Sequence, residues 1–125
     1  MPTSFCKLLG ASMVLGVAAS PARAQEQAAS VGLPSDPREL SLMCSAHLMT
    51  ASFERADDSS TWSYDEGTLK RVGNVWLEDY ARRAGVSPGD TAVGTVGDLG
   101  ETLEALDRTK RIAPLNWCVK HTPVR

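Results

Sequence analysis

The chain has 125 residues, of which 13 are Lys or Arg and 15 are Asp or Glu, so its formal net charge is −2. This length is enough for one domain and too short for a multidomain enzyme. With 42% hydrophobic and 22% charged residues, the composition is typical of a soluble globular protein and argues against a fibrous or wholly disordered chain. Because no run of Lys or Arg occurs, we expect no nucleic-acid partner.

Residues 1–24 have the pattern of a secretory signal peptide. Lys7 precedes an apolar run over residues 8–20, and an Ala-x-Ala site follows at residues 22–24. A positive charge, an apolar stretch of about 7–15 residues and such a site are the three parts of a signal. The run is shorter than the ~20 apolar residues of a membrane span, which makes a retained anchor helix the less favoured alternative. We therefore expect cleavage after Ala24 and a periplasmic or secreted product that is not bound to a membrane.

The mature chain is predicted to be all-α, with about four short helices in a small disulfide-linked bundle. Residues 25–34 show no sustained period and are expected to form a flexible N-terminal tail. A single helical domain is predicted over residues 35–125, because no segment keeps the two-residue alternation of a strand.

The first helix is predicted to begin at an Asp36-Pro37 pair. Asp36 is placed as an N-cap, and Pro37 suits the first helical position. Glu39 completes the capping pattern. Apolar residues at helical spacing continue to about Phe53, with Cys44 facing the core.

The second helix is the most regular. The segment Ser63 to Glu66 resembles a second capping box, and Gly85 is placed as a left-handed C-cap. We expect the charged residues of this helix to lie outside, the Glu78-Asp79 doublet included, as a solvated face. The predicted buried stripe consists of Leu69, Val72, Trp76, Tyr80 and Ala84.

The start of the third helix is ambiguous. Glycines recur at positions 94, 97 and 100, and each interior glycine costs a helix up to about 1 kcal/mol relative to alanine. The helix therefore begins either near Asp90 or only at Asp98. A last short helix is predicted from Ala113-Pro114 to the Thr122-Pro123 pair. The predicted structural core is Leu69, Val72, Trp76, Tyr80, Leu103 and Leu106.

Acidic residues often precede a basic residue by four positions, which favours ion pairs along helices. The chain has no Ser-His-acid motif, glycine-rich phosphate loop or dinucleotide fingerprint. We therefore predict that the protein is not an enzyme and needs no cofactor. The expected pairs are Glu66–Lys70, Glu78–Arg82, Asp79–Arg83, Glu104–Arg108 and Asp107–Arg111.

Two cysteines, Cys44 and Cys118, remain after signal cleavage. In an oxidising compartment an even pair is typical of a disulfide. Each cysteine also has a histidine three residues on, His47 and His121, so a Cys₂His₂ zinc site is the alternative. Free thiols are the third possibility.

Three short motifs lie in the later half of the chain: Gly89-Asp90-Thr91, Asp98-Leu99 and Trp117-Cys118-Val119-Lys120. With these motifs, the layout of residues 43–123 is similar to that of the Hde family of periplasmic acid-stress chaperones. This resemblance implies a small, often dimeric helical protein with one disulfide that binds unfolding client proteins at low pH.

The sequence supports three hypotheses about function. The first is an exported chaperone-like module that binds unfolded client proteins. The alternative is an immunity or inhibitor protein for a secreted toxin, with the cognate toxin as partner. A metal-binding protein that uses Cys44, His47, Cys118 and His121 is the third hypothesis, and it requires reduced cysteines.

Overall fold

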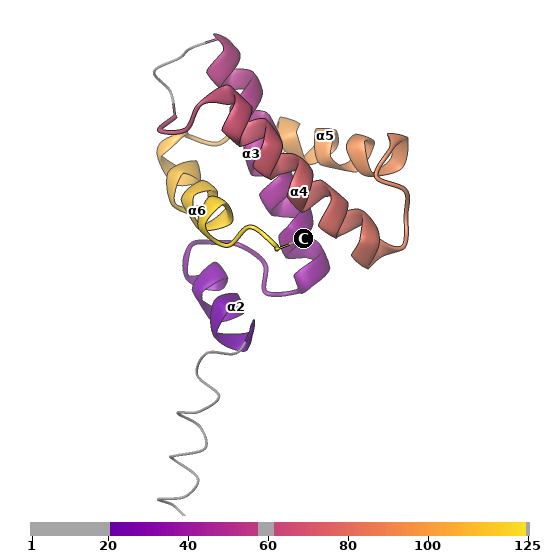
Figure 1. Ribbon diagram of the computed structural model, residues 1–125. Coiled ribbons are helices and arrows are strands. Elements are labelled where there is room, and N and C mark those ends of the chain that lie inside the picture. Colours follow the sequence, from indigo (N-terminus) through magenta and orange to yellow (C-terminus); the bar gives the residue numbers. More distant parts are fainter. Residues whose placement is uncertain (1–20, 58–61, 125) are drawn as a thin grey trace, which may run out of the picture.

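The computed structural model describes residues 21–57 and 62–124, so most of the predicted signal peptide lies outside the described residues. This part of the chain contains helices and no strand, which confirms the all-α prediction (Figure 1). Within it, no helix is both long enough and apolar enough to span a bilayer. The helices are α2 (Pro21–Ser30), α3 (Pro37–Asp57), α4 (Glu66–Ala84), α5 (Asp90–Glu104) and α6 (Thr109–Lys120).

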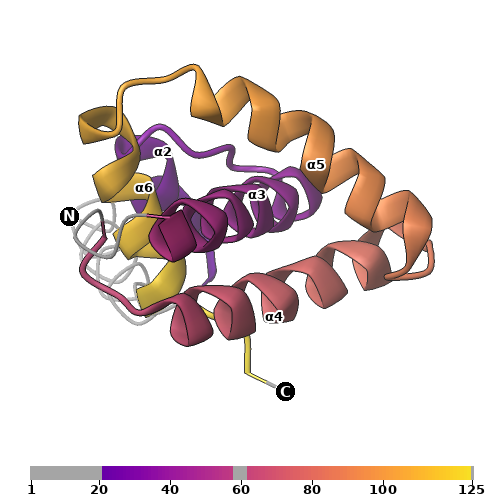
Figure 2. The same ribbon diagram turned by 90° about the horizontal axis from the view of Figure 1, so that it is seen from above.

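Helix α3 is the centre of the molecule and packs against α4, α5 and α6. Figure 2 shows α3 between α4 and α5, which meet at the turn over residues 85–89. From Leu40 to Ser52 every residue of α3 is buried or half-buried. Small side chains on α3 allow its neighbours to approach closely. The Ser45 hydroxyl, for example, donates a hydrogen bond of 3.1 Å to the backbone oxygen of Gly73 on α4.

The predicted helix caps agree with the structure except at the start of α4. Asp36 accepts a hydrogen bond from the Glu39 backbone N–H at 3.0 Å, as expected of an N-cap. The N-cap of α4 is Asp65, whose side chain accepts from the Thr68 N–H at 2.7 Å, and not Ser63. Gly85 ends α4 with φ +71°, the left-handed conformation predicted for it.

Helix α3 continues to Asp57, one turn beyond the predicted end at Phe53. Helix α6 begins at Thr109, so Pro114 lies inside it and does not start it. The extra turn of α6 before the proline carries Arg111, whose side chain is fully buried. Both differences arise because tertiary contacts continue helices past the local signals that predicted their ends.

Helix α5 begins at Asp90, which resolves the ambiguity between Asp90 and Asp98. Its apolar stripe is only partly buried, since Val93 is 53% exposed. Leu106 was predicted to be a core residue, and this prediction is wrong because its side chain is 43% exposed. Helix α5 ends at Glu104, so Leu106 falls in the following turn and no longer shares the buried face.

The predicted flexible tail over residues 25–34 is helical up to Ser30. Ala28 and Leu33 are buried in the main apolar cluster, together with residues of α3 and α6. Leu33 also donates a backbone hydrogen bond of 3.0 Å to Ala28. Val31 is half-buried and packs against the same cluster, so these few contacts do not follow a sustained helical period. Cleavage after Ala24 would cut within α2.

The buried apolar residues form two clusters on either side of α3. The first contains Trp62, Trp76 and Trp117 with the two cysteines. The second lies between α3, α4 and α5. Of the predicted core residues, Leu69, Val72 and Trp76 lie in the first cluster, Leu103 lies in the second, and Tyr80 is half-buried against the second.

Candidate functional site

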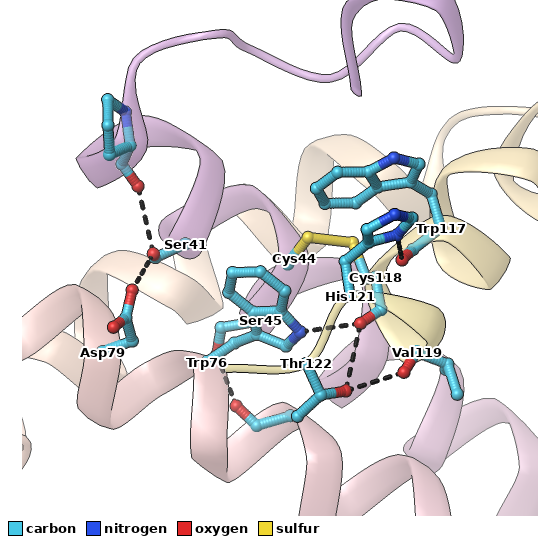
Figure 3. The surroundings of a disulfide bond; sticks show 12 residues. Ser41, Cys44, Ser45, Trp76, Asp79, Trp117, Cys118, Val119, His121 and Thr122 are labelled. Carbon is cyan, nitrogen blue, oxygen red and sulfur yellow. Dashed lines mark hydrogen bonds between the residues drawn. A yellow bond between two sulfur atoms is a disulfide. The ribbon is translucent and has the colours of Figure 1, made fainter. Parts of the chain in front are cut away.

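A disulfide between Cys44 and Cys118 joins α3 to α6, as predicted (Figure 3). The two Cα atoms are 5.5 Å apart, and the bond links positions separated by 74 residues. The disulfide engages both sulfur atoms, so the hypothetical Cys₂His₂ zinc site with His47 and His121 does not form in this state. No group of three or more His, Cys, Asp or Glu side chains within residues 21–57 and 62–124 is arranged to hold a metal ion.

Next to the disulfide a groove of about 530 Å³ opens between the start of α3, the C-terminal half of α4 and the end of α6. Figure 3 shows Ser41 and Asp79 on one side of Trp76, with Trp117 and His121 on the other. The groove is lined by Pro37, Leu40, Ser41, Trp76, Asp79, Arg83, Trp117, His121, Thr122 and Pro123.

Asp79 is a buried charged residue at one end of this groove. It is only 5% exposed, so the prediction that the Glu78-Asp79 doublet forms a solvated face is wrong for Asp79. Three side chains donate to its carboxylate: the Ser41 hydroxyl, Arg82 and Arg83, whose Nε lies 2.7 Å from Oδ2. Periodicity places Asp79 off the apolar stripe, but α3 packs close enough to cover it.

Two opposing effects act on the pKa of Asp79. Burial alone would raise the pKa of this carboxyl group. The hydrogen bond from Ser41 and the two guanidinium groups outweigh burial and hold the pKa below its usual range. Asp79 is therefore ionised at neutral pH, and its lone pairs are occupied by donors of this chain.

Aromatic rings form the walls of the groove beside the disulfide. The Trp76 indole Nε1 donates to the backbone oxygen of Cys118 at 3.0 Å, and its ring centroid lies 6.3 Å from that of Trp117. The His121 ring stacks on Trp117 with centroids 4.1 Å apart. His121 Nδ1 lies 2.9 Å from the Trp117 carbonyl oxygen, which can only accept, so Nδ1 is the donor. In the neutral ring Nε2 then remains as the acceptor.

A second polar cluster lies in the interface of α3 with α6. The Arg111 guanidinium is fully buried and makes two hydrogen bonds to the Glu54 carboxylate, at 2.6 and 3.1 Å. The same guanidinium lies 5.2 Å from the centroid of the Trp62 ring. Such a bidentate, stacked arrangement is one that arginine makes and lysine does not.

His47 is buried on α3 and belongs to the same cluster. It is 4% exposed, and its Nδ1 has no hydrogen-bond partner in the described part of the chain. Burial and the charge of Arg111 lower the pKa of His47 from 6.5 to about 4. His47 is therefore neutral at pH 7.

The predicted ion pairs agree with the structure in part. Glu66–Lys70 forms at 3.7 Å, and Asp79–Arg83 forms as described above. The expected Asp107–Arg111 pair does not form, because Arg111 points inward to Glu54. The structure also places Arg82 on Asp79 and Arg108 Nε 3.8 Å from Glu54.

Three residues of these two clusters were not singled out from the sequence: Ser41, Glu54 and, as a buried group, Arg111. Glu54 and Arg111 are 57 positions apart, and no local spacing relates them.

The comparisons with known proteins return no family model, no curated protein and no solved structure that matches this chain.

Proposed function

We propose that the mature protein is an exported module that opens in acid and then binds unfolding client proteins. The observation that carries the proposal is a neutral histidine, His47, buried beside the ion pair that holds α6 against α3. The resemblance to the Hde family supports the same function from the sequence.

Protonation of His47 acts directly on this interface. As the pH falls towards 4, His47 gains a positive charge beside Arg111. The Glu54 carboxylate offsets one positive charge, that of the Arg111 guanidinium. The buried cluster then holds a second positive charge without a counterion of its own, which is costly in an apolar interior.

Opening at this cluster exposes apolar surface while the chain stays tethered. The ion pair holds the N-terminal part of α6, whereas the disulfide holds its C-terminal part at Cys118. Release of the N-terminal part uncovers Trp62, which lies against Arg111, and Leu115, both of which are buried at neutral pH. Contiguous exposed apolar surface of this kind binds unfolded proteins.

The test is a client aggregation assay with the disulfide-intact protein. A client that precipitates at about pH 3 is mixed with this protein at pH 3. In a second assay at pH 7, the client is destabilised by heat before the two proteins are mixed. We expect suppression of light scattering at pH 3 only, with a red shift of tryptophan fluorescence over the same pH range. An unrelated acidic protein of similar size is the control. Equal suppression by both proteins, or none by either, would contradict the proposal.

A second candidate, the inhibitor of a secreted toxin, is favoured by one surface feature at neutral pH. Phe53 on α3 is 64% exposed and lines a shallow groove of about 160 Å³ together with Val93 on α5. If this surface binds a toxin, Phe53→Ser abolishes binding at pH 7 without changing stability. The acid-dependent activity of the first proposal would not change in this variant.

A further inference from the structure

We infer that the groove beside the disulfide is a binding site for a small organic anion, a carboxylate with an apolar or aromatic body. The site exists in the folded protein at neutral pH. It is therefore independent of acid opening, and either proposal can fail without the other.

The shape and the walls of the groove suit such a body. Its volume of about 530 Å³ lies within the range of about 300–1,000 Å³ that is typical of small-molecule sites. Trp76, Trp117 and Leu40 supply buried apolar surface. The walls are held in place, because Trp76 is hydrogen-bonded to Cys118, which the disulfide ties to α3. A preformed site loses little conformational entropy on binding.

The hydrogen bonding at the Asp79 end of the groove favours an anion over a cation. Asp79 and Arg83 line the groove there, and Arg82, which lines the neighbouring groove with Glu78, also donates to the Asp79 carboxylate. Because the Asp79 oxygens already accept from three donors, they offer little to a cationic ligand.

Arg83 is the group that would bind the carboxylate. It lines the groove and uses Nε alone for Asp79, and its two terminal nitrogens have no hydrogen-bond partner among the described residues. Two parallel N–H groups of a guanidinium match the two oxygens of a carboxylate. The hydrogen bond between Arg83 and Asp79 orients the Arg83 guanidinium group before the ligand binds.

His121 adds a second polar group to the same groove. Its Nδ1 is engaged with the Trp117 carbonyl, and its ring is fixed by the stack on Trp117. Nε2 makes no bond with the described residues. With Nδ1 as the donor, Nε2 of the neutral ring is an acceptor, so it suits a hydroxyl or N–H group on the body of the ligand.

The test uses isothermal titration at pH 7 with three probes of one shape: 3-phenylpropionate, its neutral amide and 3-phenylpropylamine. Octanoate and indole-3-acetate extend the panel to other apolar bodies. We expect saturable one-to-one binding of at least one carboxylate, and affinity lower by about tenfold or more for the amide, which lacks the charge-assisted hydrogen bonds. The amine should not bind.

Matched variants locate the site. Arg83→Gln should weaken carboxylate binding by about tenfold or more, and Arg83→Lys should fall between Arg83→Gln and the unmodified protein. Arg82→Gln is the control, since Arg82 also contacts Asp79 but lines a different groove with Val75 and Glu78. Circular dichroism and thermal unfolding establish that each variant is folded.

Three results would overturn the inference. The first is equal affinity for the carboxylate and its amide, and the second is an equal loss of affinity in Arg82→Gln and Arg83→Gln. The third is the absence of saturable binding by every carboxylate in the panel at about 1 mM. None of these results bears on client binding at pH 3.

Discussion

At the scale of single residues, polar side chains on α3 connect this helix to α4 and α6. Ser41 donates to Asp79 and Ser45 to the Gly73 carbonyl, both on α4. Glu54 pairs with Arg111 on α6. A buried polar group stabilises a fold only when it is hydrogen-bonded. His47 differs from these three residues, since its buried Nδ1 has no partner in the described part of the chain.

His47 makes stability depend on pH in a defined direction. Its pKa is about 4 in the folded protein and 6.5 when unperturbed, so the unfolded chain binds this proton first. The free energy of unfolding is therefore highest above pH 6.5, and it falls by about 3 kcal/mol as the pH decreases to 4. We expect His47→Leu to abolish this loss, as measured by urea unfolding at pH 7, 5.5 and 4. If the free energy of unfolding depended on pH in the variant as it does in the unmodified protein, the pH dependence would not come from His47.

Trp76 is predicted to contribute most among the residues of the α4 stripe. It is 4% exposed, and its indole donates to the Cys118 carbonyl. Trp76→Ala should therefore lower the free energy of unfolding by about 3–5 kcal/mol. Trp76→Phe is the matched control, because it keeps an aromatic ring and removes the hydrogen bond. A loss below about 1 kcal/mol for the alanine variant would show that the site is not packed.

At the scale of elements, burial of a helix and its sequence pattern are related in two different ways. Helix α4 packs on one side, so its apolar residues recur at helical spacing. Helix α3 is enclosed by three other helices, so apolar and small polar residues occur all around it and the period is weak. Helix α5 touches α3 and α4 along only part of its length. Its glycines therefore differ in how closely they approach α3.

The glycines of α5 provide a matched pair of substitutions. A Cβ at Gly97 would have no neighbour within 4 Å, whereas a Cβ at Gly100 would lie 2.8 Å from the Thr50 hydroxyl on α3. Gly97→Ala should stabilise the protein by about 0.4–1 kcal/mol, since alanine is the better helix former. Gly100→Ala should give no such gain and lower the stability, because Thr50 must move. Thermal unfolding compares the two, and an equal gain in both would show that α5 does not pack closely on α3.

At the scale of the whole molecule, one covalent bond and one central helix hold the fold together. The disulfide encloses the segment from α3 to α6, and therefore α4 and α5 as well. The apolar cores on the two sides of α3 are both modest in size. In a small domain of this kind, a cross-link that closes a long loop contributes a large fraction of the total free energy of unfolding.

Removal of the disulfide is expected to lower the free energy of unfolding by about 2–5 kcal/mol, chiefly because the unfolded chain regains conformational freedom. The double variant Cys44→Ser with Cys118→Ser tests this by urea unfolding, and the reduced unmodified protein is the control. We expect both to unfold at a similar, lower urea concentration than the oxidised protein. An unchanged midpoint would mean that packing alone maintains the fold.

The sequence by itself determined the features that depend on neighbours along the chain. It predicted α4, the buried Leu69, Val72 and Trp76 of its stripe and the left-handed Gly85, because capping and helical period act over a few residues. It also predicted the pairing of Cys44 with Cys118, because the predicted cleavage of a signal peptide would leave no other cysteine.

Only the tertiary structure decided which polar residues are buried and where the helices extend beyond their local signals. Asp79 is charged and lies off the apolar stripe, yet it is covered because α3 packs against it through Ser41. Glu54 and Arg111 meet across 57 positions, and Leu33 reaches the core from a segment without any period. Burial depends on which elements the fold brings together, and local spacing carries no information about contacts at that separation.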